Sequence, residues 1–122
     1  MNQGVKKFDV ASLCEMETVS NLFPTAKFHF TNTIKSTHSI KKAYHEFNIR
    51  HFTIDNIDEL HKITNTISDQ NDLIIHIRIR TPDDNEKFNF NHKFGISIDH
   101  VKKLIHIASS AKHKIGLSFH VG

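Results

Sequence analysis

The sequence predicts a mixed α/β fold in which about five parallel strands alternate with single helices. Runs rich in β-branched and aromatic residues recur along the 122 residues, and a stretch with apolar residues at helical spacing separates each run from the next. Successive strand starts lie roughly 20 to 25 residues apart, except for a longer last interval that contains a polar loop at 81–94. Strands that alternate with single helices pair in parallel through right-handed crossovers, which predicts one α/β domain.

Five segments have the composition of strands. They are 7–11, 27–31, 50–54, 73–80 and 114–121. The fourth gives the strongest β signal because isoleucine, a β-branched residue, recurs through it. In the last segment Ile115, Leu117 and Phe119 alternate with Ser118 and His120, so the two sets point to opposite faces of the sheet.

Four helices are expected between these strands. Ser12 is the predicted N-cap of the first helix because Glu15, three residues later, completes a capping-box pattern, and Pro24 ends that helix. The others are expected at about 36–47, after Asp55 and Asn56, and at about 98–111.

The composition argues against several classes of protein. Sixteen basic and 13 acidic residues give a formal net charge of only +3, and the lysines are spread along the chain, so no nucleic-acid partner is expected. No apolar run approaches the roughly 18 residues of a membrane span, so no membrane partner is expected, and no signal peptide is visible. Cys14 has no cysteine partner within the chain, which favours a reducing, cytoplasmic setting.

Polar groups capable of chemistry follow the strands at their C-terminal ends. They are Asp9 with Ser12, Thr31 with Asn32, Asp55, Arg78 with Arg80, and His120. Closed β/α barrels and open doubly wound sheets both bind ligands at this edge, and periodicity alone does not separate the two architectures. The Gly-x-Gly-x-x-Gly and Gly-x-x-x-x-Gly-Lys motifs are absent, so neither a dinucleotide site nor a P-loop is expected.

These candidates also have purely structural interpretations. His120 could be a hydrogen-bonded histidine at a strand end. Arg78 lies within the most apolar strand and needs a ligand or a carboxylate as partner, because an unpaired buried cation is costly, whereas Arg80 is expected to reach solvent. Asp9 and Glu15 could be acids of a catalytic site or simply groups that cap the following helix.

Eleven histidines raise the question of a metal site. None belongs to a His-Glu-x-x-His motif, and the single cysteine has no partner at zinc-ligand spacing. His45 and His51 flank a helix end, and His100 and His106 fall on different faces of one helix. We therefore expect no metal site.

Six short motifs occur in order along the chain. They are 8–15 (F-D-x-A-S-x-x-E), 30–35 (x-x-N-x-x-K), 52–60 (F-x-x-D-N-x-x-E-L), 78–84 (R-I-x-T-P-D-D), 93–95 (K-F-G) and 118–122 (S-F-H-V-G). Together these segments resemble the motifs of the pyridoxal-phosphate-dependent ornithine decarboxylase family, which has a barrel of alanine-racemase type. The resemblance implies that residues 1–122 form part of a pyridoxal-phosphate-binding domain, a partial (β/α)8 TIM-like barrel.

The resemblance also implies cofactor contacts. His120 would stack on one face of the pyridoxal ring, and Arg78 would hydrogen-bond near the phenolic oxygen of that ring. One extra residue near Pro82, relative to the family spacing, leaves Arg80 as the alternative to Arg78.

Other implied roles concern the lysine that carries the cofactor as a Schiff base. Asp9 and Glu15 would lie near that lysine, which in the family precedes the first motif, and Lys6 and Lys7 lie too close to this motif to match it. We therefore expect no catalytic residue in this chain, and we expect the N-terminal Schiff-base strand and the C-terminal half of the domain to be missing. Lys93 would support the contact of a homodimer in the complete protein.

The implied reaction is the decarboxylation of a basic amino acid by the complete protein. L-Ornithine, converted to putrescine in polyamine biosynthesis, is the expected substrate, with lysine, arginine and diaminopimelate left open. The chain by itself is expected to be inactive. The alternatives are a non-catalytic decoy that binds a regulatory protein and a small histidine-rich module that binds metal or nucleic acid.

Overall fold

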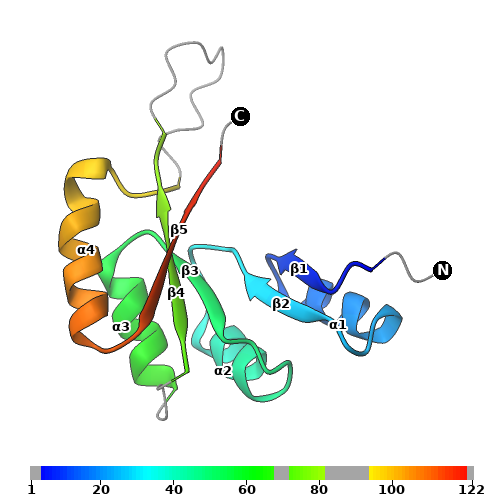
Figure 1. Ribbon diagram of the computed structural model, residues 1–122. Helices are drawn as coiled ribbons and strands as arrows, with labels where there is room; N and C mark the ends of the chain where they lie inside the picture. Colours follow the sequence, from blue (N-terminus) through cyan, green and yellow to red (C-terminus); the bar gives the residue numbers. More distant parts are fainter. Residues whose placement is uncertain (1–3, 68–71, 82–93, 121–122) are drawn as a thin grey trace.

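The computed structural model describes residues 4–67, 72–81 and 94–120, which form a parallel five-stranded sheet with helices between the strands (Figure 1). In chain order the elements are β1 (Lys7–Val10), α1 (Leu13–Leu22), β2 (Lys27–Phe30), α2 (Thr37–His45), β3 (His51–Ile54), α3 (Ile57–Thr66), β4 (Ile74–Ile79), α4 (Ile98–Ser110) and β5 (Lys114–Phe119). The strand order is β1-β2-β3-β4-β5, and each strand pairs in parallel with the next. The predicted α/β fold is confirmed.

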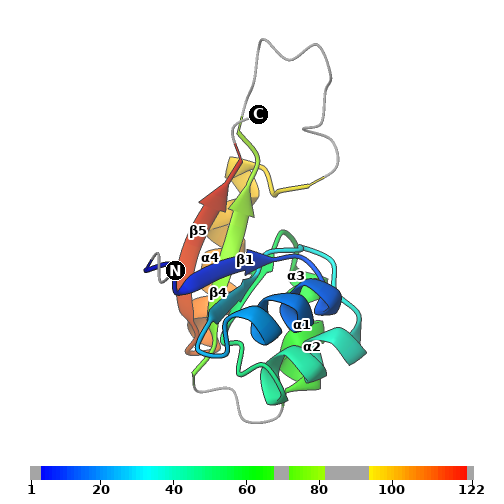
Figure 2. The same ribbon diagram turned by 90° about the vertical axis from the view of Figure 1, so that its right-hand side faces the viewer.

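The arrangement of the layers distinguishes the two architectures that periodicity left open. The described helices cover one face of a curved sheet and leave its other face uncovered (Figures 1 and 2). The strand order follows the chain order without reversal, whereas a doubly wound sheet reverses its order and carries helices on both faces. The described part is therefore a segment of a β/α barrel. None of its helices is long and apolar enough to cross a membrane.

Side-chain caps explain where two of the helices begin. At α1, Ser12 Oγ accepts a hydrogen bond from the Glu15 backbone N–H at 3.3 Å, and the Glu15 carboxylate accepts one from the Ala11 N–H at 2.7 Å. At α3, Asn56 Oδ1 accepts a hydrogen bond from the Glu59 N–H at 2.8 Å. These bonds satisfy N–H groups that a helix start leaves without a partner, and they confirm the predicted cap at Ser12.

The apolar core lies between the sheet and the helices. Strand side chains at alternate positions point toward the helices, and the helices bury their apolar stripes against them. The strand contribution is Val10, Phe28, Phe30, Phe52, Ile54, Ile75 and Ile77, and the helix contribution includes Met16, Ile40, Leu60, Ile63 and Leu104. This packing fixes which side chains remain on the uncovered face.

A buried ion pair joins three segments at the C-terminal edge of the sheet. Lys35 Nζ lies 3.1 Å from Glu59 Oε1, and the two side chains are 0% and 3% exposed. The same ammonium donates hydrogen bonds to the carbonyl oxygens of Asn32 at 2.8 Å and Thr53 at 2.6 Å. Burial lowers the pKa of Lys35 to about 8, and the negative charge of Glu59 opposes this shift. The pair therefore ties the ends of β2 and β3 to the start of α3.

Replacing the acid of this pair should destabilise the chain strongly. We expect Glu59→Ala to lower the free energy of unfolding by about 3–5 kcal/mol, because it leaves the buried Lys35 ammonium without its countercharge. Urea titration followed by circular dichroism measures the change. Glu59→Gln, which keeps an acceptor oxygen, should lose less.

Glu17→Ala is the matched control. Glu17 also pairs with a lysine, Lys42, at 2.8 Å, but both side chains are accessible to solvent, so its removal should cost much less. Equal losses in Glu59→Ala and Glu17→Ala would contradict a structural role for the buried pair.

Candidate functional site

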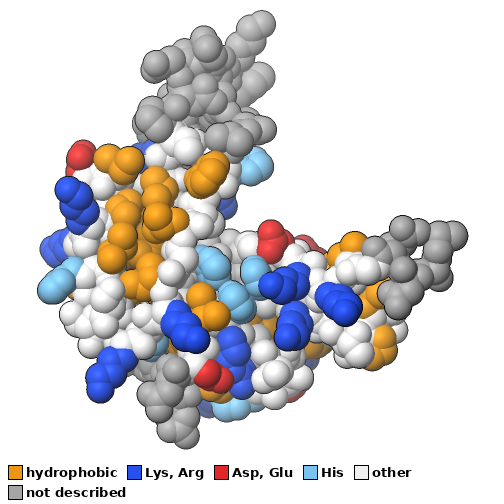
Figure 3. All heavy atoms as spheres, viewed as in Figure 1, with side chains coloured by type: hydrophobic (Ala, Val, Ile, Leu, Met, Phe, Trp, Pro, Cys, Tyr) orange, Lys and Arg blue, Asp and Glu red, His pale blue; other side chains and the backbone are white. Residues whose placement is uncertain are grey.

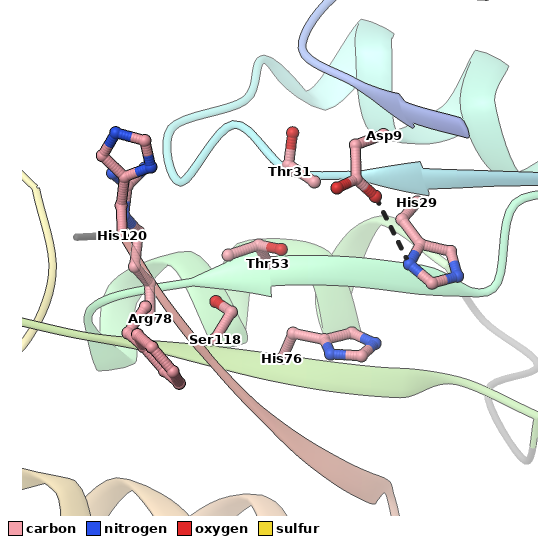
Figure 4. A pocket seen from close by; sticks show the side chains of 9 residues that line it. Asp9, His29, Thr31, Thr53, His76, Arg78, Ser118 and His120 are labelled. Carbon is pink, nitrogen blue, oxygen red and sulfur yellow. Dashed lines mark ion pairs between the residues drawn. The ribbon is translucent and has the colours of Figure 1, made fainter. Parts of the chain in front are cut away.

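The uncovered face of the sheet carries a cavity of about 320 Å³ (Figure 4). Its lining comes from both edge strands and from the strands between them. The residues are Asp9, His29, Thr31, Thr53, His76, Arg78, Ser118, Phe119 and His120. In a flat sheet, four interstrand steps of about 4.8 Å would separate the two edges by about 19 Å, so it is the curvature that lets β1 and the end of β5 line one cavity.

Three of the four expected cofactor residues meet at this cavity. Asp9 reaches it from β1, Arg78 from β4, and His120 from the end of β5. The hydroxyl of Thr81 donates a hydrogen bond to the carbonyl oxygen of His120 at 3.1 Å, which holds the chain there beside the end of β4.

Two expected site residues do not line the cavity as described. Glu15 lies at the start of α1 and outside the lining of the cavity. Its carboxylate accepts a hydrogen bond from the Ala11 N–H, which is the capping role given above as the structural alternative. Lys93 lies outside the described residues, so its expected role in a dimer remains a prediction.

The structure separates the two arginines at the end of β4. Arg78 lines the cavity, and its guanidinium lies 5.6 Å from the centre of the Phe94 ring. Arg80, which we expected to reach solvent, is half-buried, and it donates from Nη2 to the carbonyl oxygen of Gly95 at 3.1 Å. The backbone groups of Arg78 and Arg80 also pair with Ile96. Arg78 is therefore the arginine that a ligand in the cavity can reach.

Glycine is required at position 95 because the chain there passes close to the backbone of Arg80. Its φ is +97°, which side chains rarely allow, and an added Cβ would lie 3.0 Å from the backbone nitrogen of Arg80. Its own N–H donates to Asp55 Oδ2 at 3.0 Å. Gly95 is thereby fixed against the ends of β3 and β4, beside the cavity.

Three histidines on this face form a cluster that motif spacing did not predict. The rings of His29 and His51 stack with centroids 4.0 Å apart and planes 14° apart. His51 Nδ1 lies 2.9 Å from His76 Nε2, and His29 Nδ1 lies 3.6 Å from Asp9 Oδ1. Each histidine precedes a residue that lines the cavity by two positions, and these residues are Thr31, Thr53 and Arg78. An alignment of the three strands on these residues would have revealed the histidine cluster.

The surroundings keep two of these rings neutral at pH 7. Burial lowers the pKa of His51 to about 4, and the charges of His29, His76 and Lys7 add to the shift. Burial also lowers the pKa of His76. A neutral imidazole has one N–H and one nitrogen lone pair. One of the two rings can therefore donate a hydrogen bond to the other across the 2.9 Å contact between His51 and His76.

The lowered pKa of His51 predicts a loss of stability in acid. Because this pKa is 6.5 in an ordinary setting and about 4 here, the unfolded chain binds a proton first as the pH falls. The stability contribution is complete above pH 6.5 and is lost as the pH falls toward 4. His51→Gln should therefore flatten the dependence of the free energy of unfolding on pH in this window, as measured by urea titration at each pH.

His38→Gln provides the control because His38 is exposed on α2, away from the cluster. Its pH dependence should match that of the unmodified chain. If the free energy of unfolding of His51→Gln depended on pH as that of the unmodified chain does, His51 would not be the source of the acid sensitivity.

Two curated relatives align with nearly all of the chain. A probable ornithine decarboxylase of Dictyostelium discoideum is 34% identical over 118 residues, which cover 94% of this chain and 24% of the relative. The ornithine decarboxylase of Schizosaccharomyces pombe is 34% identical over 124 residues, which cover 100% of this chain and 28% of the relative. The chain thus spans about a quarter of the length of these relatives.

Solved structures agree with this similarity. The arginine decarboxylase of Paramecium bursaria Chlorella virus aligns with a TM-score of 0.81 and 29% identity, covering 95% of this chain and 31% of that one. A mutant of SrLDC in complex with PLP aligns with a TM-score of 0.79 and 29% identity, covering 95% and 30%. The described sheet therefore has the fold of the corresponding part of these decarboxylases.

A family model extends the match to the full sequence. The model described as pyridoxal-dependent decarboxylase, pyridoxal binding domain, matches residues 1–122. Its cofactor, pyridoxal phosphate, agrees with the solved neighbour that contains PLP. The chain therefore belongs to the pyridoxal-dependent decarboxylase family and matches the model of its pyridoxal binding domain.

Proposed function

We propose that the protein containing this chain converts L-ornithine to putrescine by pyridoxal-phosphate-dependent decarboxylation, and that the cavity is one wall of its cofactor site. The observation that carries the proposal is the meeting of Asp9, Arg78 and His120, from three strands, around one cavity. We choose ornithine as the substrate because the two curated relatives reported above are a probable ornithine decarboxylase and an ornithine decarboxylase. A homodimer and a cytoplasmic location remain predictions.

The polar groups of the cavity suit a pyridoxal ring. Ser118 Oγ is buried and has no hydrogen-bond partner among the described residues. Within the same residues no carboxylate lies within ion-pair distance of the Arg78 guanidinium. A hydroxyl and a cation without partners can serve a ligand rich in acceptor oxygens, and the flat imidazole of His120 can pack against a ring.

Bound pyridoxal phosphate supplies the electron sink that stabilises the carbanion left when carbon dioxide departs. Within this chain, Arg78 would hold an oxygen of the cofactor, and His120 would limit the movement of the ring from one side. Asp9 would place negative charge at the opposite edge of the cavity, where it favours a proton on a neighbouring amine. Glu15 would position Asp9 indirectly, by fixing the chain after β1 through its bond to the Ala11 N–H.

The chain by itself should not release carbon dioxide from ornithine. Among the described residues no lysine lines the cavity, so the cofactor has no amine to hold it covalently there. Carboxyl-labelled L-ornithine, incubated with the purified chain and pyridoxal phosphate, measures this directly. Release above a protein-free blank would contradict the prediction.

Cofactor affinity should depend on Arg78 more than on Arg80. We expect Arg78→Gln to weaken pyridoxal phosphate binding to the chain about tenfold or more, because it removes a charge-assisted hydrogen bond worth about 1.5–3 kcal/mol. Arg80→Gln is the matched control, since Arg80 is engaged by Gly95 outside the cavity. Equilibrium dialysis measures both affinities.

Circular dichroism establishes that each variant is folded before the comparison. Equal losses in the two variants would contradict the assignment of Arg78. A folded chain that binds no pyridoxal phosphate would overturn the proposed cofactor wall.

A further inference from the structure

The proposed decarboxylation assigns no role to the cluster of His29, His51 and His76, although His29 and His76 line the cavity. One ligand nitrogen from each ring can be chosen so that all three lie within 4.8 Å of one another. His76 pairs with Gly116, four residues before His120, which places the cluster about 13 Å deeper along the strands at about 3.3 Å per residue. Figure 3 shows histidine side chains gathered on this hollowed face, and Figure 4 places His29 and His76 at the end of the cavity away from His120.

Strand register and a glycine bring the three rings together. His29 and His51 are direct partners across β2 and β3, whereas His76 is the partner of Thr53, two residues further along. The His76 ring therefore reaches back along the strands to meet His51. Gly116 leaves the space for this ring, because a Cβ at that position would lie 2.6 Å from His76 Nδ1.

The distance between His51 and His76 is close to the one that a zinc ion requires. Two nitrogens bound to one tetrahedral Zn²⁺ at about 2.0–2.1 Å lie about 3.3 Å apart, so the 2.9 Å contact between His51 and His76 has to open by only a few tenths of an ångström. The stacked ring of His29 has to turn about χ2, a torsion with broad minima. Asp9, 3.6 Å from His29 Nδ1, stands where a carboxylate orients a metal-binding imidazole through its other nitrogen.

The ligand set indicates the class of cation. Three imidazoles without a thiolate suit Zn²⁺ and its neighbours in the first transition row, whereas Mg²⁺ and Ca²⁺ prefer oxygen ligands. Three protein nitrogens with a fourth position open to the cavity form a known arrangement of zinc. We propose that His29, His51 and His76 bind one Zn²⁺ ion on the open face of the sheet, with Asp9 as the outer carboxylate of His29.

Zinc titration of the purified chain tests the proposal. The chain competes for Zn²⁺ with a chromophoric chelator, in the absence of pyridoxal phosphate, so that the outcome does not depend on the proposed decarboxylation. We expect one tight site per chain, and X-ray absorption at the zinc edge should report three nitrogen ligands from histidine at about 2.0 Å.

Two variants test the cluster, one by removing a ligand and one by crowding a ligand ring. His51→Gln removes one ligand, and we expect affinity about tenfold weaker or more, with two histidine ligands in the absorption spectrum. Gly116→Ala keeps all three histidines but crowds the His76 ring, and it should also weaken binding. The double variant His100→Gln and His106→Gln removes two histidines of α4, outside the cluster, and should bind zinc as the unmodified chain does.

Circular dichroism establishes that each variant has the secondary structure of the unmodified chain. The proposal is overturned if the folded chain takes up no zinc or if His51→Gln binds it with unchanged affinity. A loss of affinity in the α4 double variant as large as in His51→Gln would also overturn it, because the ion would then bind to surface histidines.

Discussion

Pleating turns successive side chains of each strand to opposite faces of the sheet, and both the core and the cavity depend on this alternation. In β3 and β4, Phe52, Ile75 and Ile77 are buried beneath the helices. Their immediate neighbours, among them Thr53 and His76, point to the uncovered face. A shift of pairing by one residue would exchange the two sets, so the apolar core fixes the register that brings the polar groups together.

The rim of the cavity is held by interactions outside its lining. The buried pair of Lys35 and Glu59 ties the ends of β2 and β3 to α3. Gly95 lies between Asp55 and the end of β4, and it keeps the Arg80 guanidinium away from the cavity. Arg78 is thereby left as the cation that faces a ligand, which is the geometry that the proposed cofactor wall needs.

The two proposals use different depths of one face. The groups proposed for pyridoxal phosphate, Arg78, Ser118 and His120, lie toward the C-terminal ends of the strands, where β/α barrels bind their ligands. The histidine cluster lies deeper, where His51 and His76 share a contact of 2.9 Å. Asp9 is common to both because it lines the cavity and also stands beside His29.

The sequence alone determined the α/β class, the approximate strand and helix positions, and the cap at Ser12, because local periodicity and capping groups act over a few residues. Family motifs also predicted that Asp9, Arg78 and His120 belong to one site, and the structure brings these three to one cavity. The choice between Arg78 and Arg80 required the structure, since it depends on where Gly95 and Ile96 pack against the end of β4. The histidine cluster required it too, because its three members come from different strands and only the tertiary register makes them neighbours.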